Sequence, residues 1–224
     1  MSIWQVRIAT ILLVAFVVAE PSSSFAAISV KSEIKADVGL SALPVKGRAP
    51  KTGYSREEFG PAWSDVDRNG CDTRSDILKR DLTDLIFGAG TYNCVVTSGT
   101  LVDKYSGETI NFLRGVTTSS EVQIDHLVAL SNAWQTGAFK LTPESRKQMA
   151  NDPLNLLAVK GRLNSQKGDG DAATWLPPRR SFWCSYVAHQ IAVKVKYKLW
   201  VTKPEKAQMV RILATCPSQV LPVN

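Results

Sequence analysis

Three short segments limit the fold that this chain can adopt more than any other feature, because they carry acidic, imidazole and amide side chains in a fixed order. The first is Ile124-Asp125-His126-Leu127, the second is Asn155-Leu156-Leu157-Ala158-Val159, and the third runs from Asn164 to Asp169. The first two segments are typical of short buried strands, and the third is typical of a helix start. This order of strand, strand and helix predicts an α+β domain that brings the polar side chains together.

The same side chains suit the hydrolysis of a phosphodiester. We expect His126 to act as a general base, because an unperturbed imidazole has a pKa near ~6.5 and a positioned base contributes roughly 10²–10⁴-fold. Asp125 and Asn164 offer hard oxygen ligands, which suit Mg²⁺ or Mn²⁺ better than zinc. Such a metal would neutralise charge on the reacting phosphate. With one charged protein ligand, the metal site should be weak until phosphate and water complete it.

The N-terminus has the features of a secretory signal. One positive charge within Met1–Arg7 precedes an apolar run from Ile8 to Ala19, and mostly small residues follow as far as Ala27. The apolar run is too short to span a bilayer comfortably. We therefore expect cleavage after Ala26, a secreted protein and no membrane association after cleavage; the alternative is an uncleaved membrane anchor.

Cleavage of residues 1–26 would leave 198 of the 224 residues, enough for one domain with a core. Residues 27–51 mix Lys, Gly, Pro and Ser without a sustained period, and they predict a flexible leader. The domain is expected over residues 52–219, followed by a tail over residues 220–224. The net charge of +7 suits a polyanionic partner, but charge alone does not identify one.

The chain has four cysteines, Cys71, Cys94, Cys184 and Cys216. In an oxidising compartment they can form disulfides in three pairings, and proximity along the chain favours Cys71–Cys94 and Cys184–Cys216. Since no pair has the Cys-x-x-Cys spacing of a zinc or redox site, we interpret all four as structural.

Hydrophobic spacing predicts a mixture of helices and strands. Helices are expected over residues 76–87, 129–138, 143–150 and 185–200, and another begins at Arg162. Strand-like segments occupy residues 94–97, 100–102, 109–113, 121–125 and 154–159, with a turn at Tyr105-Ser106-Gly107. Thr202-Lys203-Pro204-Glu205 is a capping box that opens a last helix to about Ala214.

The order of these motifs resembles the HNH (His-Me finger) endonucleases, specifically their secreted, GmrSD-C-terminal-like branch. The resemblance extends from about Tyr54 to Cys216, and the motifs are strong in combination although each is weak alone. Its markers are Tyr54-Ser55-Arg56, residues 69–74, Arg80-Asp81-Leu82, residues 124–130, Ala133-Trp134 with Gly137-Ala138, residues 150–152, residues 155–159, Asn164 with Lys167-Gly168-Asp169, and Trp175-Leu176-Pro177. The resemblance implies a single disulfide-stapled α+β domain, built around a ββα-metal core with additional helices.

The resemblance also implies roles for individual residues. Asn155 would lie behind the catalytic histidine and fix its ring, and Asp125 and Asn164 would be the metal ligands. The third letter of HNH is asparagine here, so a tight zinc site is not expected. Lys167 is a candidate for a catalytic phosphate contact, with a solvated lysine at a helix start as the alternative. His189 has no carboxylate near it in sequence, and we assign it no role at the site.

An upstream segment matches a calcium-binding loop in part. Asp65, Asp67, Asn69 and Asp76 have EF-hand spacing, except that aspartate replaces the twelfth-position glutamate and the incoming helix is interrupted by Gly60-Pro61. A structural Ca²⁺ site is one interpretation, and a turn that places Asp72 and Arg74 near the active site is the preferred one. Arg74 can then hold a phosphate bidentately, although a structural ion pair is an equal alternative.

The sequence thus predicts a secreted metal-dependent endonuclease with low sequence specificity. No base-reading module is evident, which favours contacts to the nucleic-acid backbone. DNA is favoured over RNA by the resemblance, and no protein partner is indicated. Part of the basic set Arg179, Arg180, Lys194, Lys196 and Lys198, near Trp175 and Trp183, can add a nucleic-acid track, although a solvated helix surface is the favoured interpretation for any single lysine. The alternative function is a non-catalytic extracellular nucleic-acid-binding protein on the same fold.

Overall fold

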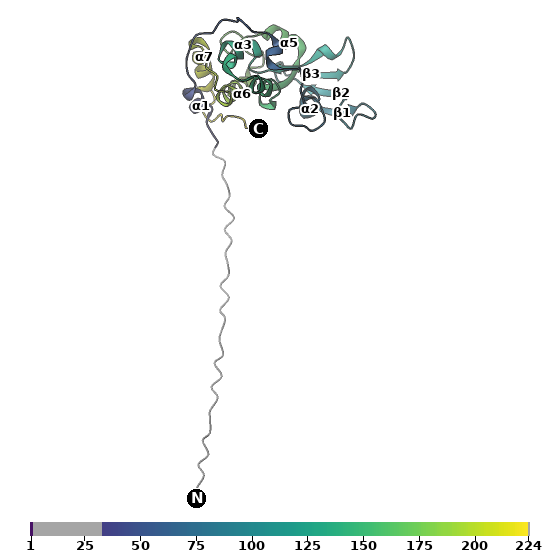
Figure 1. Cartoon of the computed structure of the whole chain (residues 1–224). Coiled ribbons are helices and arrows are strands. Elements are labelled where there is room, and N and C mark those ends of the chain that lie inside the picture. The colour runs from purple at the N-terminus through teal and green to yellow at the C-terminus, as the bar shows by residue number, and fades with distance from the viewer. Residues whose placement is uncertain (2–32, 224) are drawn as a thin grey trace. The chain divides into compact units, whose positions relative to one another are not determined.

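The computed structural model describes residues 33–223 together with Met1 (Figure 1). Apart from Met1, the predicted signal over residues 1–26 lies outside the described residues. In the part of the chain that is described, every helix is too short or too polar to cross a membrane. Helices and strands are combined in a mixed domain that carries two disulfides, as the sequence predicted.

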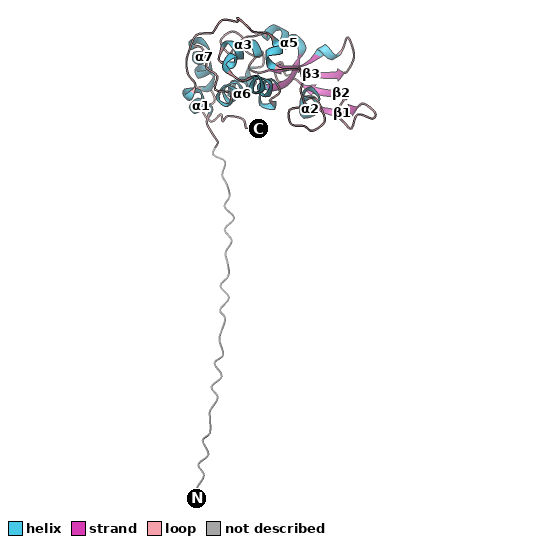
Figure 2. Cartoon of the chain, viewed as in Figure 1, coloured by secondary structure: helices cyan, strands magenta, loops and turns pink. Residues whose placement is uncertain are grey.

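Helices make up one side of the described domain, around the central helix α6 (Trp183–Lys196) (Figure 2). Tyr186, Val187 and Ile191 of α6 are completely buried. The helices that accompany it are α1 (Ala36–Ala42), α3 (Leu130–Gln135), α4 (Pro143–Ala150) and α7 (Lys203–Leu213). Helix α7 opens with the predicted capping box, in which Thr202 and Glu205 each accept a backbone N–H.

A three-stranded antiparallel sheet lies at the other side, with strands in the order β1-β2-β3 (Figure 1). Its strands are β1 (Leu82–Phe87), β2 (Val96–Val102) and β3 (Thr109–Leu113), and helix α2 (Thr73–Asp81) precedes them. Apolar side chains of α2 and of this sheet form a second core with the inner residues of the two remaining strands. The sheet therefore supports the segment that carries the candidate site.

The remaining strands are β4 (Val122–His126) and β5 (Leu156–Lys160), which pair antiparallel, and β5 leads directly into α5 (Gly161–Lys167). The register places Asp125 opposite Leu157 and His126 opposite Leu156. Only glycine fits at the β5–α5 junction, because a Cβ on Gly161 would lie 1.9 Å from the carbonyl oxygen of Ser120. The backbone can therefore approach Ser120 closely at the point where β5 passes into α5.

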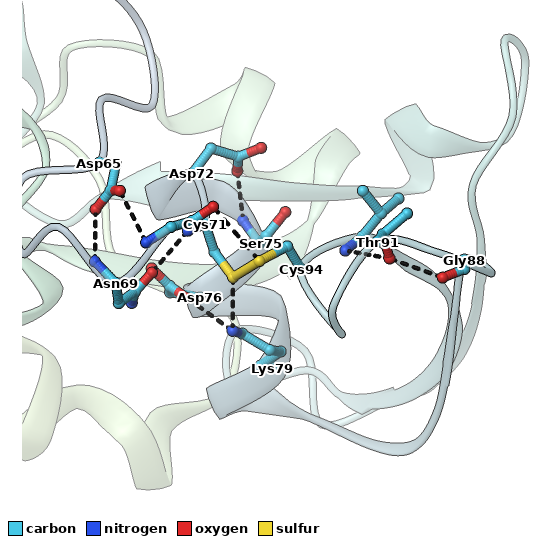
Figure 3. The surroundings of a disulfide bond; sticks show 12 residues. Asp65, Asn69, Cys71, Asp72, Ser75, Asp76, Lys79, Gly88, Thr91 and Cys94 are labelled. Carbon is cyan, nitrogen blue, oxygen red and sulfur yellow. Dashed lines mark hydrogen bonds and ion pairs between the residues drawn. A yellow bond between two sulfur atoms is a disulfide. The ribbon is translucent and has the colours of Figure 1, made fainter.

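The disulfide pairing favoured by the sequence is confirmed, since Cys71 is bonded to Cys94 and Cys184 to Cys216. The first bond joins the segment before α2 to the loop between β1 and β2 (Figure 3). The second joins the first turn of α6 to the segment after α7. Each bond ties together segments from different elements of the fold.

The prediction of a flexible leader over residues 27–51 needs correction for its described part. Ala36 and Leu40 of α1 are buried in the main core, and the Ala49 amide donates to the Gln135 carbonyl at 2.8 Å. The tail expected over residues 220–224 is also anchored, because Leu221 is buried in the same core and its amide donates to Ile34. Burial against distant helices, which local composition does not reveal, orders both segments.

The predicted helix over residues 76–87 is also wrong in its second half. Helix α2 ends at Asp81, and residues 82–87 form β1 against β2. The two segments predicted at residues 94–97 and 100–102 belong largely to one strand, β2. Pairing with that strand satisfies the β1 backbone, so tertiary contacts override the helical spacing of Leu82, Leu85 and Ile86.

A buried ion pair between α6 and α7 generates a stability prediction. Lys194 Nζ lies 2.7 Å from Glu205 Oε1, and both side chains are at most 1% exposed. Burial lowers the pKa of Lys194, while Glu205 opposes that shift. Glu205→Gln keeps the shape but removes the counter-charge, so we expect a loss of about 3–5 kcal/mol in the free energy of unfolding, measured by urea denaturation.

The matched control is Glu108→Gln, which removes the exposed partner of Lys160. Because solvent screens that pair, we expect a loss of at most ~1 kcal/mol. Equal losses for the two variants would contradict a dominant role for the buried pair.

Candidate active site

His126 ends strand β4, and its ring is held from two sides. Nε2 lies 2.9 Å from the Ala150 carbonyl oxygen at the end of α4. The ring of Trp63 lies parallel to the imidazole, with 6.0 Å between centroids and 11° between planes. Because a carbonyl oxygen only accepts hydrogen bonds, Nε2 carries the proton and Nδ1 keeps its lone pair.

The surroundings of His126 keep its imidazole neutral. Burial lowers its pKa from 6.5 to about 4, the bond to Ala150 opposes that shift, and the positive charges of Arg56 and Lys167 add to it. At neutral pH the ring is therefore an acceptor at Nδ1. A general base requires this protonation state.

Asp125 is buried beside the histidine, and both of its carboxylate oxygens have partners. Oδ1 lies 2.9 Å from Lys167 Nζ, and Oδ2 accepts a hydrogen bond from the Tyr105 hydroxyl at 2.5 Å. The Asp125 side chain is 4% exposed and that of Lys167 is 0% exposed. The carboxylate is thus fixed in orientation and has a neutralising charge next to it.

The predicted phosphate contact by Lys167 does not fit this placement. Lys167 Nζ donates to the His126 carbonyl at 2.7 Å as well as to Asp125. Its ammonium group lies beneath the site rather than at its surface, because the buried carboxylate needs a counter-charge. The alternative of a solvated lysine does not fit either, and the structure instead gives Lys167 a supporting position.

Asn155 is completely buried and binds backbone on both sides of the histidine. Its Oδ1 accepts from the Val128 amide at 2.8 Å, and its Nδ2 donates to the Val128 and Met149 carbonyls at 3.4 Å. These contacts fix the chain after His126 and the residue before Ala150. Asn155 therefore supports the imidazole through the backbone and not through direct contact with the ring.

Asn164, on α5, lines the same pocket as Asp125 and His126, which has a volume of about 300 Å³. Its Nδ2 donates to Gln123 Oε1 at 2.8 Å, and this bond orients the amide. The amide oxygen, the atom that can bind a metal, then lies on the other side of the group. The three central residues of the sequence prediction thus meet in one pocket.

Two arginines lie at this pocket, and only one was expected there. Arg74 is half-buried and donates to the Val122 carbonyl at 3.2 Å; burial, and then the charge of Arg114, lower its pKa. The described residues form no ion pair with Arg74, so the alternative of a structural ion pair does not hold among them. Arg56 is exposed at the rim, and sequence reasoning assigned it no role.

Trp63, Tyr105 and Gln123 were also missed as residues of the site. Each acts through a contact that the sequence does not reveal: Trp63 on the His126 ring, Tyr105 on Asp125, and Gln123 on Asn164. Tyr105 had been placed only in a turn. Gln123 directly precedes the motif over residues 124–130, which was the nearest available signal, whereas Trp63 and Tyr105 lie outside the resemblance motifs.

The segment with EF-hand spacing forms a tight hydrogen-bonded loop before α2 (Figure 3). The Asn69 amide donates to Asp65 and Asp67, and its side chain donates to Asp67 and Asp76 at 3.0 Å. Asp76 also pairs with Lys79 at 2.9 Å. In the described part of the chain, no three His, Cys, Asp or Glu side chains are grouped so as to hold a metal.

The residues of the predicted basic track do not form one surface in the structure, because some of them are buried or paired. Lys194 is buried in its pair with Glu205 and cannot contact a nucleic acid. Lys196 is partly exposed but pairs with Asp152 at 2.6 Å, and Arg180 lies over the Trp183 ring at 5.3 Å. The structure therefore does not unite these residues as one free basic surface.

Comparisons with known proteins agree with the resemblance seen in the sequence. Residues 72–212 match the family described as GmrSD restriction endonucleases, C-terminal domain. An uncharacterized secreted protein of Arthroderma benhamiae is 40% identical over 179 residues, which cover 79% of this chain and 82% of that protein. No solved structure matches the chain. The secreted relative and the two disulfides agree with the predicted extracellular location.

The buried neutral imidazole predicts a pH dependence of stability. Between pH 6.5 and about 4 the unfolded chain binds a proton at His126 that the folded chain does not, so stability falls as the pH falls. The variant His126→Phe has no titrating side chain at this position. Between pH 7 and pH 4.5 we therefore expect its free energy of unfolding to fall by about 2–3 kcal/mol less than that of the parent protein. Denaturant unfolding with EDTA present measures this, and equal losses in both proteins would contradict the buried neutral state.

Proposed function

The chain belongs to the family of the GmrSD restriction endonuclease C-terminal domain, and we propose that it is a secreted, metal-dependent endonuclease. It hydrolyses phosphodiester bonds of nucleic acid with low sequence specificity. The observation that carries the proposal is the pocket in which a neutral His126 lies beside Asp125 and Asn164. DNA is the favoured substrate, because the family is described by restriction endonucleases.

His126 is the proposed general base. Nδ1 accepts a proton from the attacking water, while Nε2 stays bonded to the Ala150 carbonyl. This bond and the parallel Trp63 ring hold the imidazole in one orientation, so little reorganisation is needed during proton transfer. As the ring gains charge, the Ala150 carbonyl oxygen stabilises it, and the bound phosphate adds negative charge beside it.

Asp125 and Asn164 are the proposed ligands of Mg²⁺ or Mn²⁺. A carboxylate and an amide oxygen on neighbouring elements suit these ions, which commonly bind one or two carboxylates and keep several waters. When bound, the ion would polarise the phosphate and stabilise the leaving oxygen. Tyr105 and Lys167 fix the carboxylate, but the lysine also offsets its charge, so the protein alone should hold the ion weakly.

Arg56 and Arg74 are the proposed phosphate contacts. Both line the pocket, and a guanidinium can bind two phosphate oxygens at once. Arg56 is exposed at the rim, where it can meet the incoming strand, and Arg74 is held deeper by Val122. The net charge of +7 adds long-range attraction for the polyanion.

The test is cleavage of plasmid DNA and single-stranded DNA by the secreted form of the chain, with Mg²⁺, Mn²⁺ or EDTA. We expect metal-dependent cutting that EDTA abolishes and that His126→Ala reduces by at least about 10²-fold, since the base is lost. The matched control is His189→Ala, because His189 is the chain's other histidine and its Nδ1 lies against the Ser185 carbonyl on α6.

Cutting at the parental rate by His126→Ala would contradict the assignment of the base. Tight DNA binding without cutting under every metal would instead favour the non-catalytic alternative.

A further inference from the structure

A second pocket, of about 240 Å³, adjoins the pocket that contains Asp125, and the two meet at His126. Both are lined by Arg56, Trp63, His126 and Leu130. Their chemistry differs, because the first pocket adds Asp125, two amide side chains and Arg74, whereas the second adds mostly apolar residues together with Glu57 and Asn151. We call the second one the apolar pocket.

The walls of the apolar pocket are suited to a flat apolar group. They include Phe59, Pro61, Ala62, Trp63, Leu130 and Ala150. Its volume is below the roughly 300–1,000 Å³ of pockets that enclose drug-sized ligands. A single ring system therefore suits it better than a longer ligand.

The position of Trp63 in this wall is fixed by its backbone conformation and by hydrogen bonds of the segment that follows it. Its backbone adopts a φ of 57°, a conformation that a bulky residue rarely takes and that surrounding structure must enforce. The Trp63 carbonyl accepts from the Thr73 amide at the start of α2, and the Ser64 carbonyl accepts from the Thr73 hydroxyl. The hydrogen-bonded loop of Asp65 and Asn69 follows directly, and Cys71–Cys94 secures it (Figure 3).

Asn151 gives the same pocket a polar group. It is 1% exposed, its Nδ2 donates to the Lys147 carbonyl at 2.9 Å, and its Oδ1 has no hydrogen-bond partner among the described residues. A buried acceptor without a partner is costly. A ligand N–H that reached this acceptor would relieve that cost.

We propose that the apolar pocket binds the nucleobase next to the scissile phosphate, and that the enzyme therefore acts on unpaired nucleotides. The inference rests on the proposed function. A phosphate in the first pocket brings its attached nucleoside to the neighbouring one, since both pockets share the His126 wall. The base stacks on apolar and aromatic side chains, which accept any base because every base has a π-face.

Unpaired substrate follows from the geometry of the pocket. A base inside a duplex is stacked and paired, and it must be flipped out before it can enter a pocket of this kind. Single strands and locally opened duplexes avoid that cost. The sequence tolerance of stacking also agrees with low sequence specificity.

The experiment compares single-stranded oligothymidylate, its duplex, and a strand of abasic tetrahydrofuran units, all with Mn²⁺. We expect the parent protein to cut the single strand at least about tenfold faster, in kcat/KM, than either of the others. Ala62→Phe, which fills the pocket from an exposed position, should bring the ratio of thymidylate to abasic cutting close to one.

Two further variants make the comparison specific. Trp63→Phe keeps an aromatic wall and should retain most of the preference for the base-bearing strand. Tyr92→Ala removes an aromatic side chain that is 98% exposed and lines neither pocket, so it should keep the parental ratio.

The possible failures are distinguishable. Equal cutting of thymidylate and abasic strands by the parent protein, or equal cutting of single strand and duplex, would overturn the nucleobase site and leave the nuclease intact. Absence of cutting of any strand under Mg²⁺ or Mn²⁺ would overturn the proposed function itself.

Discussion

The buried pair of Asp125 and Lys167 is the interaction on which the candidate site depends. It joins the end of β4 to the last turn of α5, and Lys167 also binds the His126 carbonyl. Removing either charge would leave the other buried without a partner, which is far more costly than losing a surface pair. The pair therefore fixes the distance between the strand that carries the histidine and the helix that carries Asn164.

The rest of the fold maintains this arrangement through separate contacts. Asn155 fixes the backbone on both sides of the imidazole, and the β4–β5 register sets the direction of the strand. The sheet core supports these strands from one side, while the main core carries α6 and α7. The tethered loop before α2 presents Trp63 to the ring. The ion pair of Asp125 with Lys167, the hydrogen bonds of Asn155 and the ring of Trp63 thus all help to position the neutral imidazole of His126.

The sequence predicted the parts of this structure that depend on local patterns. The strand ending at His126, the helix over residues 143–150 and the capping box at Thr202 follow from spacing and capping chemistry. The meeting of Asp125, His126 and Asn164 was predicted from the order of the motifs and the resemblance. The wrong predictions concern segments whose structure depends on contacts with distant parts of the chain. Helix α1 packs against helices far along the chain, and Leu82 pairs with β2 in a sheet. The position of Lys167 was unpredictable for the same reason, since its partner is 42 residues away.

The proposed mechanism depends on a catalytic metal that Asp125 and Asn164 hold beside His126. The most direct measurement is anomalous diffraction from crystals of His126→Ala soaked with Mn²⁺ and a single-stranded oligonucleotide. We expect a manganese peak bonded to the Asp125 carboxylate and the Asn164 amide oxygen, together with a phosphate of the oligonucleotide. A peak confined to the loop of Asp65, Asp67, Asn69 and Asp76, or none beside Asp125, would rule out this metal site.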